Sequence, residues 1–211
     1  MIESEKKLAA EAAARLAADG MRIGLGTGST VAHLLPALAA RGLDVRCVAT
    51  SPATEAAARK LGISVGPFEG IDRLDLAIDG ADQVAPDGWL VKGGGGAHTR
   101  EKIVAAAAER FVVIADSSKP VAEIEAPVPL ELHSFGLAAT LRELGAAELR
   151  DAPPSPDGGA IADYRGEVNE PERLAAWLAS VPGVLQHGLF PPTLVSEVLI
   201  GRGRAVERIE V

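Results

Sequence analysis

The segment with the clearest potential for chemistry is Gly24-Leu25-Gly26-Thr27-Gly28-Ser29-Thr30. Its glycines let a ligand approach the backbone, and the first amides of the helix expected after it, with three hydroxyl groups, can bind an oxyanion. A tight strand-to-helix turn capped by Ser29 or Thr30 is the alternative interpretation. A dinucleotide-binding turn has less support. The glycine spacing is G-x-G-x-G, and the next strand ends in Thr50-Ser51 without the ribose-binding acid that such a site needs.

Two carboxylates stand three residues apart in Asp79-Gly80-Ala81-Asp82, at the end of a predicted buried strand. Ligands of open α/β sheets bind at the carboxyl ends of the strands. An Asp-Gly pair alone is usually only a turn, whereas the second carboxylate favours a site.

The third segment is Lys92-Gly93-Gly94-Gly95-Gly96-Ala97-His98-Thr99-Arg100-Glu101-Lys102. Four consecutive glycines cost backbone entropy, so a flexible loop is one interpretation. A run of amides offered to an oxygen-rich ligand is the better one, because Lys92 precedes the glycines and Glu101 follows within one helical turn. Glu101 taken alone could instead complement the helix dipole.

The fourth segment, Ala115-Asp116-Ser117-Ser118-Lys119, follows a strongly apolar strand. Lys119 by itself is typical of a solvated surface lysine. We expect all four segments to converge at the carboxyl ends of one sheet, and the set is far more specific than any member.

Helices alternating with short apolar strands must position these segments, and that alternation predicts βαβ units with a parallel sheet. Pro36 lies inside the second helix and predicts a kink or an early end there. Thr99 is expected to cap the fourth helix. The predicted helices span 3–19, 31–40, 53–61 and 100–109, and the predicted strands span 22–25, 45–50, 63–65, 74–78, 89–91 and 111–115.

The pattern changes near Pro120, where prolines 127 and 129 are expected to bracket a short strand. The fold class is therefore α/β: a Rossmann-like parallel-sheet domain, 1–125 plus 194–211, with a smaller α+β domain, 126–193, inserted. The inserted part is predicted to hold strands 161–164 and 183–190 and helices 135–144 and 171–180. Segments 194–200 and 206–211 are expected to return to the first sheet.

The amino-acid composition argues against several classes of function and binding partner. Of 211 residues 47% are apolar but only 3% aromatic, so the core must be aliphatic, and the formal net charge of -8 argues against nucleic acid or an anionic membrane as partner. One cysteine, Cys47, allows no intramolecular disulfide and no cysteine-based zinc site, and no two of the four histidines have metal-ligand spacing. The first 20 residues lack an apolar signal core, and no stretch of about 18 apolar residues exists, so a cytoplasmic protein without a membrane span is expected.

Together the motifs closely resemble type A ribose-5-phosphate isomerase. The resemblance runs from Lys6 through GLGTGST, DGAD, KGGGGAHTREKI and VVIADSSK, roughly the first 120 residues. It continues more loosely through Pro129-Leu130-Glu131, Pro182-Gly183-Val184, Gly188-Leu189-Phe190 and the terminal strand.

The resemblance implies an aldose–ketose isomerase that interconverts D-ribose 5-phosphate and D-ribulose 5-phosphate through an enediol. Such an enzyme needs no cofactor and no metal, and it serves the non-oxidative branch of the pentose phosphate pathway. Its partner is a small sugar phosphate, and a homodimer is the family's expected state.

The resemblance also implies residue roles. Glu101 matches the family's catalytic base, Asp79 would assist ring opening, and Asp82 and Lys92 would stabilise developing charge. The phosphate would contact Lys119, with Lys6 as a further contact, and residues Thr27, Gly28, Ser29 and Thr30. The sugar would lie against Asp79, Gly80, Ala81, Asp82, Lys92, Gly93, Gly94 and Gly95.

Several positions depart from the family's pattern. Gln83 replaces an acid, His98 replaces an aliphatic residue, Gly158-Gly159 replace an Asn-containing turn, and Pro191-Pro192-Thr193 replace a polar turn. These changes bear on the dimer surface and on affinity more than on the reaction.

Two other functions remain open from the sequence. A non-catalytic sugar-phosphate sensor is disfavoured by the intact Glu101 and Lys92 and by the lack of a DNA-binding segment. A nucleotide-dependent oxidoreductase is disfavoured because the acid expected near Thr50 is missing.

Overall fold

A computed structural model describes all 211 residues. Five of its strands form the expected parallel sheet, and a sixth strand, β13, lies antiparallel at one edge. The order across this sheet is β13-β12-β6-β3-β1-β2. The strands are β1 (Arg22–Leu25), β2 (Arg46–Ala49), β3 (Leu76–Gly80), β6 (Phe111–Asp116), β12 (Glu197–Arg202) and β13 (Ala205–Glu210).

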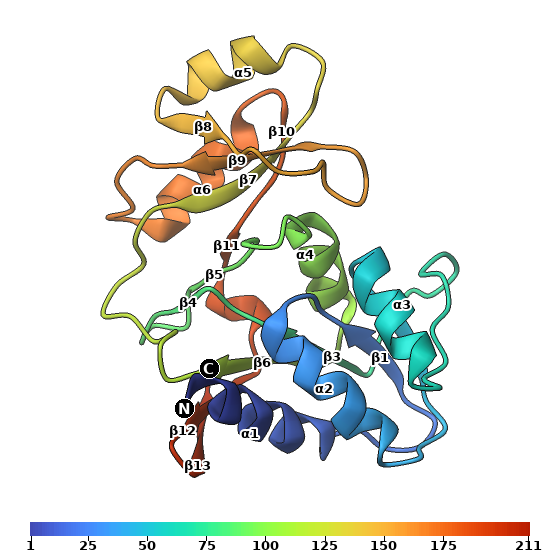
Figure 1. Ribbon diagram of the computed structural model, residues 1–211. Coiled ribbons are helices and arrows are strands. Elements are labelled where there is room, and N and C mark those ends of the chain that lie inside the picture. The colour runs from blue at the N-terminus through green and yellow to red at the C-terminus, as the bar shows by residue number, and fades with distance from the viewer. The chain divides into compact units, whose positions relative to one another are not determined.

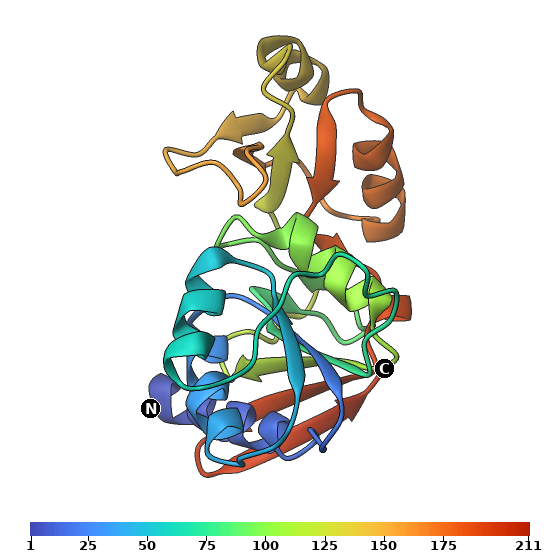
Figure 2. The same cartoon turned by 90° about the vertical axis from the view of Figure 1, so that its right-hand side faces the viewer.

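Four helices accompany this sheet: α1 (Ile2–Ala14), α2 (Ser29–Ala39), α3 (Pro52–Lys60) and α4 (His98–Ala107). The alanines of α1 and the leucines of α2 share one core with the sheet, and Figures 1 and 2 show these helices together on the same face. Helix α4 lies on the other face, where a Cβ added to Gly24 would overlap the side chain of Val104. Successive strand residues point to opposite faces, so Ile23 and Leu25 can fill the first core while Gly24 admits α4.

The C-terminal ends of α1 and α2 differ from what the sequence predicts. Helix α1 ends at Ala14 rather than residue 19, because Arg41 Nη1 donates to the carbonyls of Ala14 and Ala17 at 2.6 Å each and satisfies the end of the helix. Helix α2 continues past Pro36 to Ala39, so the expected early end is wrong. Pro36 removes the hydrogen bond to the carbonyl of Ala32, and both residues lie on the exposed side of α2, where water can replace it.

The segments that follow β2 agree with the sequence prediction only in part. Helix α3 forms as predicted, with Ser51 Oγ accepting a hydrogen bond from Thr54 N at 3.2 Å. The strand predicted over 63–65 is only a single parallel bridge between Val65 and Cys47.

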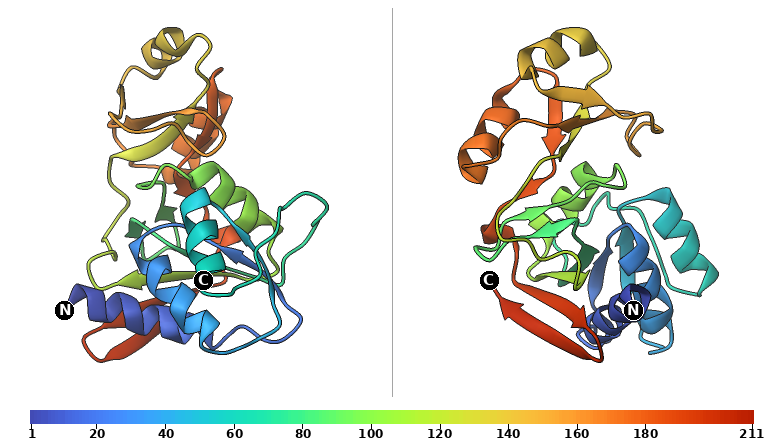
Figure 3. Two further views of the ribbon diagram at one scale, coloured as in Figure 1. Left: turned by 45° about the vertical axis from the view of Figure 1, so that its right-hand side comes forward. Right: turned by 60° about the vertical axis from the view of Figure 1, so that its left-hand side comes forward.

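A second group of elements forms two small sheets. The four-stranded sheet has the order β10-β7-β9-β8, and the three-stranded sheet has the order β11-β5-β4. Leucines of α6 are buried in the core of the larger sheet, which is drawn from yellow to orange in Figure 3. The elements are β4 (Gln83–Val84), β5 (Leu90–Val91), β7 (Val128–Leu132), β8 (Ala147–Leu149), β9 (Ala160–Tyr164), β10 (Val184–His187), β11 (Leu189–Phe190), α5 (Leu137–Leu144) and α6 (Pro171–Ser180).

The strand predicted over 183–190 is in fact two strands in different sheets, separated at Gly188. A Cβ on Gly188 would overlap the carbonyl oxygen of Lys92, so only glycine allows the chain to change sheets here. Pro129 lies inside β7 rather than beyond its end. The pairing of β10 with β7 stops at Leu130, and beyond it the carbonyl of Pro129 accepts from Gly188 N at 2.7 Å.

The chain divides into two units. Unit 1 comprises Met1–Ala81, Arg100–Lys119 and Pro192–Val211, and unit 2 comprises Asp82–Thr99 and Pro120–Pro191. These bounds differ from the expected 1–125 plus 194–211 and 126–193, mainly because residues 82–99 group with unit 2. The reason is that β4 and β5 pair with β11 and not with the large sheet. None of the helices combines the length and the apolar composition that a membrane span requires.

Candidate active site

Three of the four predicted segments lie at one edge of the unit 1 sheet. Residues 26–30 follow β1, Asp79 and Gly80 end β3, and residues 117–119 follow β6. These three strands are adjacent and parallel, so their carboxyl ends meet at the same edge. The segment with four glycines does not share this edge, so the expected convergence of all four segments is wrong: Gly93-Gly94-Gly95-Gly96 follows β5, in the three-stranded sheet of unit 2.

Asp79 organises the glycine-rich loop after β1. Its carboxylate is buried, and its Oδ1 accepts from the amides of Thr27 at 3.1 Å and Gly80 at 2.7 Å. A Cβ on Gly26 would overlap this carboxylate, which explains the glycine in physical terms. The loop and the carboxylate therefore hold each other in place.

The start of α2 is arranged in a way that suits an anion. The residue before the helix is Gly28 at φ 123°, and no side chain caps the helix, so the capping by Ser29 or Thr30 that the alternative interpretation required is not found. An uncapped helix start presents amide donors and a partial positive charge. Ser29 and Gly28 are exposed, whereas Thr30 is buried.

Two hydroxyl groups near this loop were not singled out by the sequence analysis. Thr27 Oγ1 lies 2.8 Å from Thr50 Oγ1 and 3.4 Å from Thr54 Oγ1, and Thr54 Oγ1 donates to the Gly26 carbonyl at 2.9 Å. The signal that could have found them is the position of Thr50 and Thr54 just beyond β2, at the same sheet edge.

The loop after β6 is held by two buried carboxylates. Asp116 Oδ1 accepts from Ser118 N at 2.9 Å, and the Asp116 carbonyl accepts from Lys119 N at 3.2 Å. Glu5, on α1, accepts from Ser117 N at 3.1 Å and from the Ser117 hydroxyl at 2.5 Å. Lys119 is thus attached to a fixed backbone while its side chain stays partly exposed. Lys6 lies next to Glu5 in α1, with its Nζ 2.7 Å from Glu3 Oε1.

Glu101 lies in the first turn of α4 and is only 4% exposed. The helix begins at His98, two residues earlier than predicted, so Thr99 is not its cap. The Thr99 hydroxyl instead donates to buried Glu131. Burial lowers the pKa of the neighbouring Lys102 to about 7.

In unit 2, the four-glycine loop is held through its backbone. Gly94 N donates to Asp82 Oδ2 at 2.8 Å, while the carbonyls of Gly93 and Gly94 accept from Arg150 Nη1 at 3.0 and 3.1 Å. Gly94 and Gly95 are exposed. Arg150 was not anticipated, because it lies 57 residues from Gly93 in the sequence.

Lys92 and His98 flank this loop and are both buried. Lys92 is 2% exposed, its Nζ lies 5.4 Å from the centre of the Phe190 ring, and its backbone amide donates to Gly188 O at 2.9 Å. The His98 ring packs so closely on Gly93 that a Cβ there would lie 2.6 Å from Nδ1. The structure thus supports a packing role for His98. No group of three or more His, Cys, Asp or Glu side chains is arranged to hold a metal ion.

The predicted site residues therefore fall into two sets. Unit 1 holds Glu101, Lys119 and the glycine-rich loop of residues 26–30. Asp79, Gly80 and Ala81 lie at the end of the adjacent strand. Unit 2 holds Asp82, Lys92, Gly93, Gly94 and Gly95, and among these Asp82 and Gly94 are hydrogen-bonded to each other.

Comparison with known proteins identifies the family of the chain. The family model described as ribose 5-phosphate isomerase A (phosphoriboisomerase A) matches residues 46–205. Ribose-5-phosphate isomerase A of Caulobacter vibrioides is 44% identical over 224 residues, covering 99% of this chain and 98% of the relative. The Halobacterium salinarum protein of the same name is 47% identical over 202 residues, covering 88% and 87%.

Solved structures agree over the whole chain. Ribose 5-phosphate isomerase A of Neisseria gonorrhoeae superimposes with a TM-score of 0.95 at 32% identity, covering 100% of this chain and 97% of that one. A D-ribose-5-phosphate isomerase in complex with phospho-erythronic acid gives a TM-score of 0.93 at 34% identity, with both chains fully covered. On sequence and structure alike, the chain belongs to the ribose 5-phosphate isomerase A family.

Proposed function

We propose how the candidate site residues carry out the reaction of this family, the interconversion of D-ribose 5-phosphate and D-ribulose 5-phosphate through an enediol. As a family member the chain is an aldose–ketose isomerase. The observation that carries the residue assignment is Glu101, a buried carboxylate in the first helical turn after a lysine and four glycines. No feature of the molecule favours a non-catalytic sensor or an oxidoreductase.

The phosphate group is assigned to unit 1. Uncapped amides at the start of α2 and the hydroxyls of Thr27, Ser29 and Thr30 can donate to its oxygens, and Lys119 supplies a full positive charge. Lys6 is a further contact. A solved relative of this chain binds phospho-erythronic acid, itself a phosphorylated sugar acid, which supports a phosphorylated ligand here.

Ring opening is assigned to Asp79. The furanose must open before its C1 aldehyde exists, and opening requires a proton to leave one sugar oxygen and another to reach the ring oxygen. A carboxylate held by two backbone amides can exchange such protons without changing position.

Isomerisation is assigned to Glu101. Its carboxylate removes the proton on C2 of the open aldose, the electron pair forms the C1–C2 double bond, and O1 gains a proton to give the enediol. Returning the proton to C1 as the C2 hydroxyl loses its own gives the ketose. Lys92 and the amides of Gly93 and Gly95 stabilise the oxygens as charge develops, and Asp82, held by the Gly94 amide, orients them. The proton moves within one carbon pair, so the chemistry requires no redox partner.

A coupled assay of the purified protein tests this function. Ribose 5-phosphate should be converted after exhaustive treatment with EDTA and without added nucleotide, and unphosphorylated ribose should be a very poor substrate. Equal use of the two sugars would contradict the phosphate assignment. Activity lost with EDTA and restored by a metal would contradict the proton-transfer mechanism.

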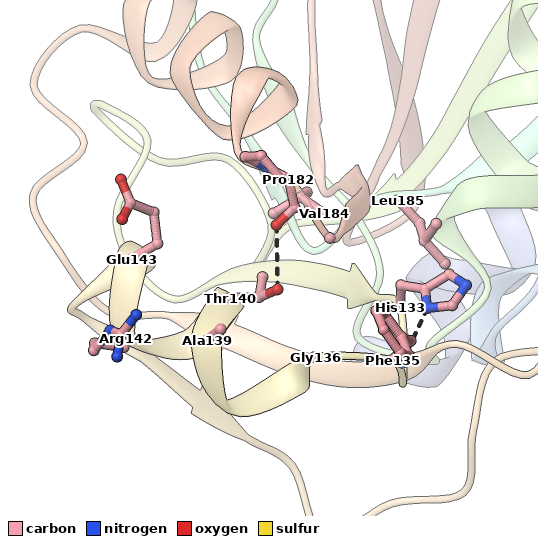
Figure 4. A pocket seen from close by; sticks show the side chains of 11 residues that line it. His133, Phe135, Gly136, Ala139, Thr140, Arg142, Glu143, Pro182, Val184 and Leu185 are labelled. Atoms are coloured by element: carbon pink, nitrogen blue, oxygen red, sulfur yellow. Dashed lines mark hydrogen bonds between the residues drawn. The ribbon is translucent and has the colours of Figure 1, made fainter.

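We further propose that two copies of the chain form a homodimer through a groove of about 720 Å³ in unit 2. Figure 4 shows Phe135 and His133 at one end of the groove, Arg142 and Glu143 at the other, and Thr140 between them. Phe135 is 87% exposed, an unusual state for a large apolar ring. A two-fold interface uses the same patch twice, so a protruding ring beside a groove can complement a second copy of itself.

Sedimentation tests the dimer. Wild type should sediment as a dimer and Phe135→Ser as a monomer of unchanged fold. A monomeric wild type at micromolar concentration would contradict the dimer, and a dimeric variant would contradict the interface.

The cytoplasm and the non-oxidative branch of the pentose phosphate pathway are proposed as the setting of the reaction. The proposal rests on the substrate of the family, a pentose phosphate. Expression of this protein in a bacterial strain that lacks its own ribose-5-phosphate isomerase should restore growth without added ribose. If the protein is active and well expressed but growth is not restored, the proposed setting is contradicted.

A further inference from the structure

The four-glycine loop can stabilise charge only if it is held in one conformation. Glycine restricts the backbone least of all residues, so four in succession leave many conformations open. Backbone amides stabilise a developing charge only when they are oriented beforehand. One hydrogen bond within the loop, from Gly96 N to the Gly93 carbonyl at 3.0 Å, closes a turn. The peptide units of Gly94 and Gly95 must be held by other parts of the chain.

Arg150 makes four hydrogen bonds that meet this requirement. Nε and Nη2 donate to the two carboxylate oxygens of Asp163 at 2.8 and 2.6 Å, which fixes the plane of the guanidinium. Nη1 donates to the carbonyls of both Gly93 and Gly94. The Arg150 side chain is only 20% exposed and that of Asp163 12%. The hydrogen bonds that Arg150 donates to Asp163 raise the pKa of Arg150 above its ordinary value, so the guanidinium stays charged.

Because each peptide unit is planar and trans, fixing its carbonyl also fixes the direction of its N–H. The only cis peptide bond of the chain precedes Pro127, so each N–H in the loop points away from the carbonyl of the same peptide unit. The unit joining Gly93 and Gly94 is held at both ends, by Arg150 at its carbonyl and by Asp82 at its N–H. The unit joining Gly94 and Gly95 is held at its carbonyl, which directs the Gly95 N–H away from Arg150.

We propose that Arg150, braced by Asp163, is a positioning residue for the isomerase reaction. It sets the orientation of the Gly94 and Gly95 amides and of Asp82, and it makes no contact with the substrate itself. The inference rests on the function proposed above. Only arginine suits this role, because a lysine ammonium cannot hold a carboxylate and two carbonyls in one plane.

The test compares Arg150→Ala and Arg150→Lys with Arg165→Ala. Arg165 is a matched control, since it pairs with Glu148 at 2.6 Å and also joins β8 to β9, but it does not contact the loop. Misplaced active-site groups can cost up to about 100-fold in rate, so both Arg150 variants should lower kcat by about 10- to 100-fold. KM should stay within about threefold, because the phosphate contacts of unit 1 are intact. Arg165→Ala should leave both constants unchanged.

Chemical rescue separates positioning from a loss of folding. Added guanidinium should restore part of the kcat of Arg150→Ala, and none of that of Glu101→Gln. Folded Arg150 variants with the kcat of the control would overturn the inference. The inference would also be overturned if the thermal midpoint of Arg150→Ala collapsed and guanidinium restored none of its kcat. An inactive wild type or a fully active Glu101→Gln would instead overturn the proposed function.

Discussion

The two glycine-rich loops of this protein are held in different ways. The loop of residues 24–30 in unit 1 is fixed by Asp79 on the neighbouring strand, whose carboxylate occupies the space where a Cβ of Gly26 would lie. The loop of residues 92–96 in unit 2 is fixed by Arg150 and Asp82, through hydrogen bonds to its backbone. One loop depends on close packing at a sheet edge, and the other on polar groups that reach it from elsewhere in the chain.

Under the proposed function, the first loop binds the phosphate and the second loop lies where the chemistry takes place. A rigid loop at a helix start suits a phosphate, whose charge does not change during the reaction. A loop set by hydrogen bonds suits the carbons and oxygens where charge develops, because small shifts of its amides alter transition-state stabilisation. Substitutions near the first loop should therefore act mainly on KM, and those near the second mainly on kcat.

The largest effect is expected for Glu101→Gln. The amide keeps the shape of the carboxylate but cannot accept the C2 proton, and removing a general base costs about 10²–10⁴-fold in rate. A coupled assay should show this loss in kcat, while a product-binding titration should show little change. Activity within a few-fold of wild type would contradict the assignment of the base.

Lys119→Ala should act mainly on KM, whereas Glu101→Gln should act mainly on kcat. Loss of one charge-assisted hydrogen bond costs about 1.5–3 kcal/mol, so kcat/KM for ribose 5-phosphate should fall about 10- to 100-fold, mostly through KM. Turnover of unphosphorylated ribose, slow in wild type, should not change. An equal loss for the two sugars, or a loss confined to kcat, would break the separation of the two loops.

Alanine substitutions in the loops provide a direct comparison. Gly26→Ala would force the buried Asp79 carboxylate aside and should destabilise the fold by about 1–3 kcal/mol, as overpacking does. In Gly94→Ala the new Cβ would lie 2.8 Å from the end of the Asp82 side chain, which can turn away, so the thermal midpoint should fall less. Gly66→Ala is the control, because nothing lies within 4 Å of a Cβ there. Equal midpoints for all three variants would show that close packing does not hold the first loop.

The smallest effect concerns acid stability. Hydrogen bonds from the Ser117 hydroxyl and then from Gly203 N hold the pKa of Glu5 below its ordinary value of 4.5. A lowered carboxylate pKa contributes stability that is fully present above pH 4.5 and is lost as the pH falls through the folded-state pKa. Glu5→Gln should therefore lower the thermal midpoint at pH 7 and differ less from wild type at pH 3.

Ser117→Ala serves as the partner variant for Glu5, since it removes the larger of the two causes. It should reduce the pH dependence of the midpoint without abolishing it. A difference between wild type and Glu5→Gln that is constant from pH 7 to pH 3 would contradict the role of Glu5 at this loop.

The sequence by itself determined the repeating strands and helices and the residue types of the site. Strand Arg22–Leu25 and helix Pro171–Ser180 have the predicted bounds, because apolar periodicity, a following glycine turn and a proline at the helix start are local signals. The parallel sheet was predictable for the same reason. The placement of three segments at one sheet edge followed from the rule for carboxyl ends of parallel strands.

Only the tertiary structure decided where distant polar groups meet. The change of sheet at Gly188, the hydroxyl of Thr99 bound to Glu131 instead of capping α4, and the guanidinium of Arg150 on the glycine loop have no local signal. Each depends on residues about 30 to 100 positions apart that come together only when two sheets and their loops pack. Local propensity cannot encode such a contact, because the same dipeptide or turn is compatible with many partners, and packing selects one of them.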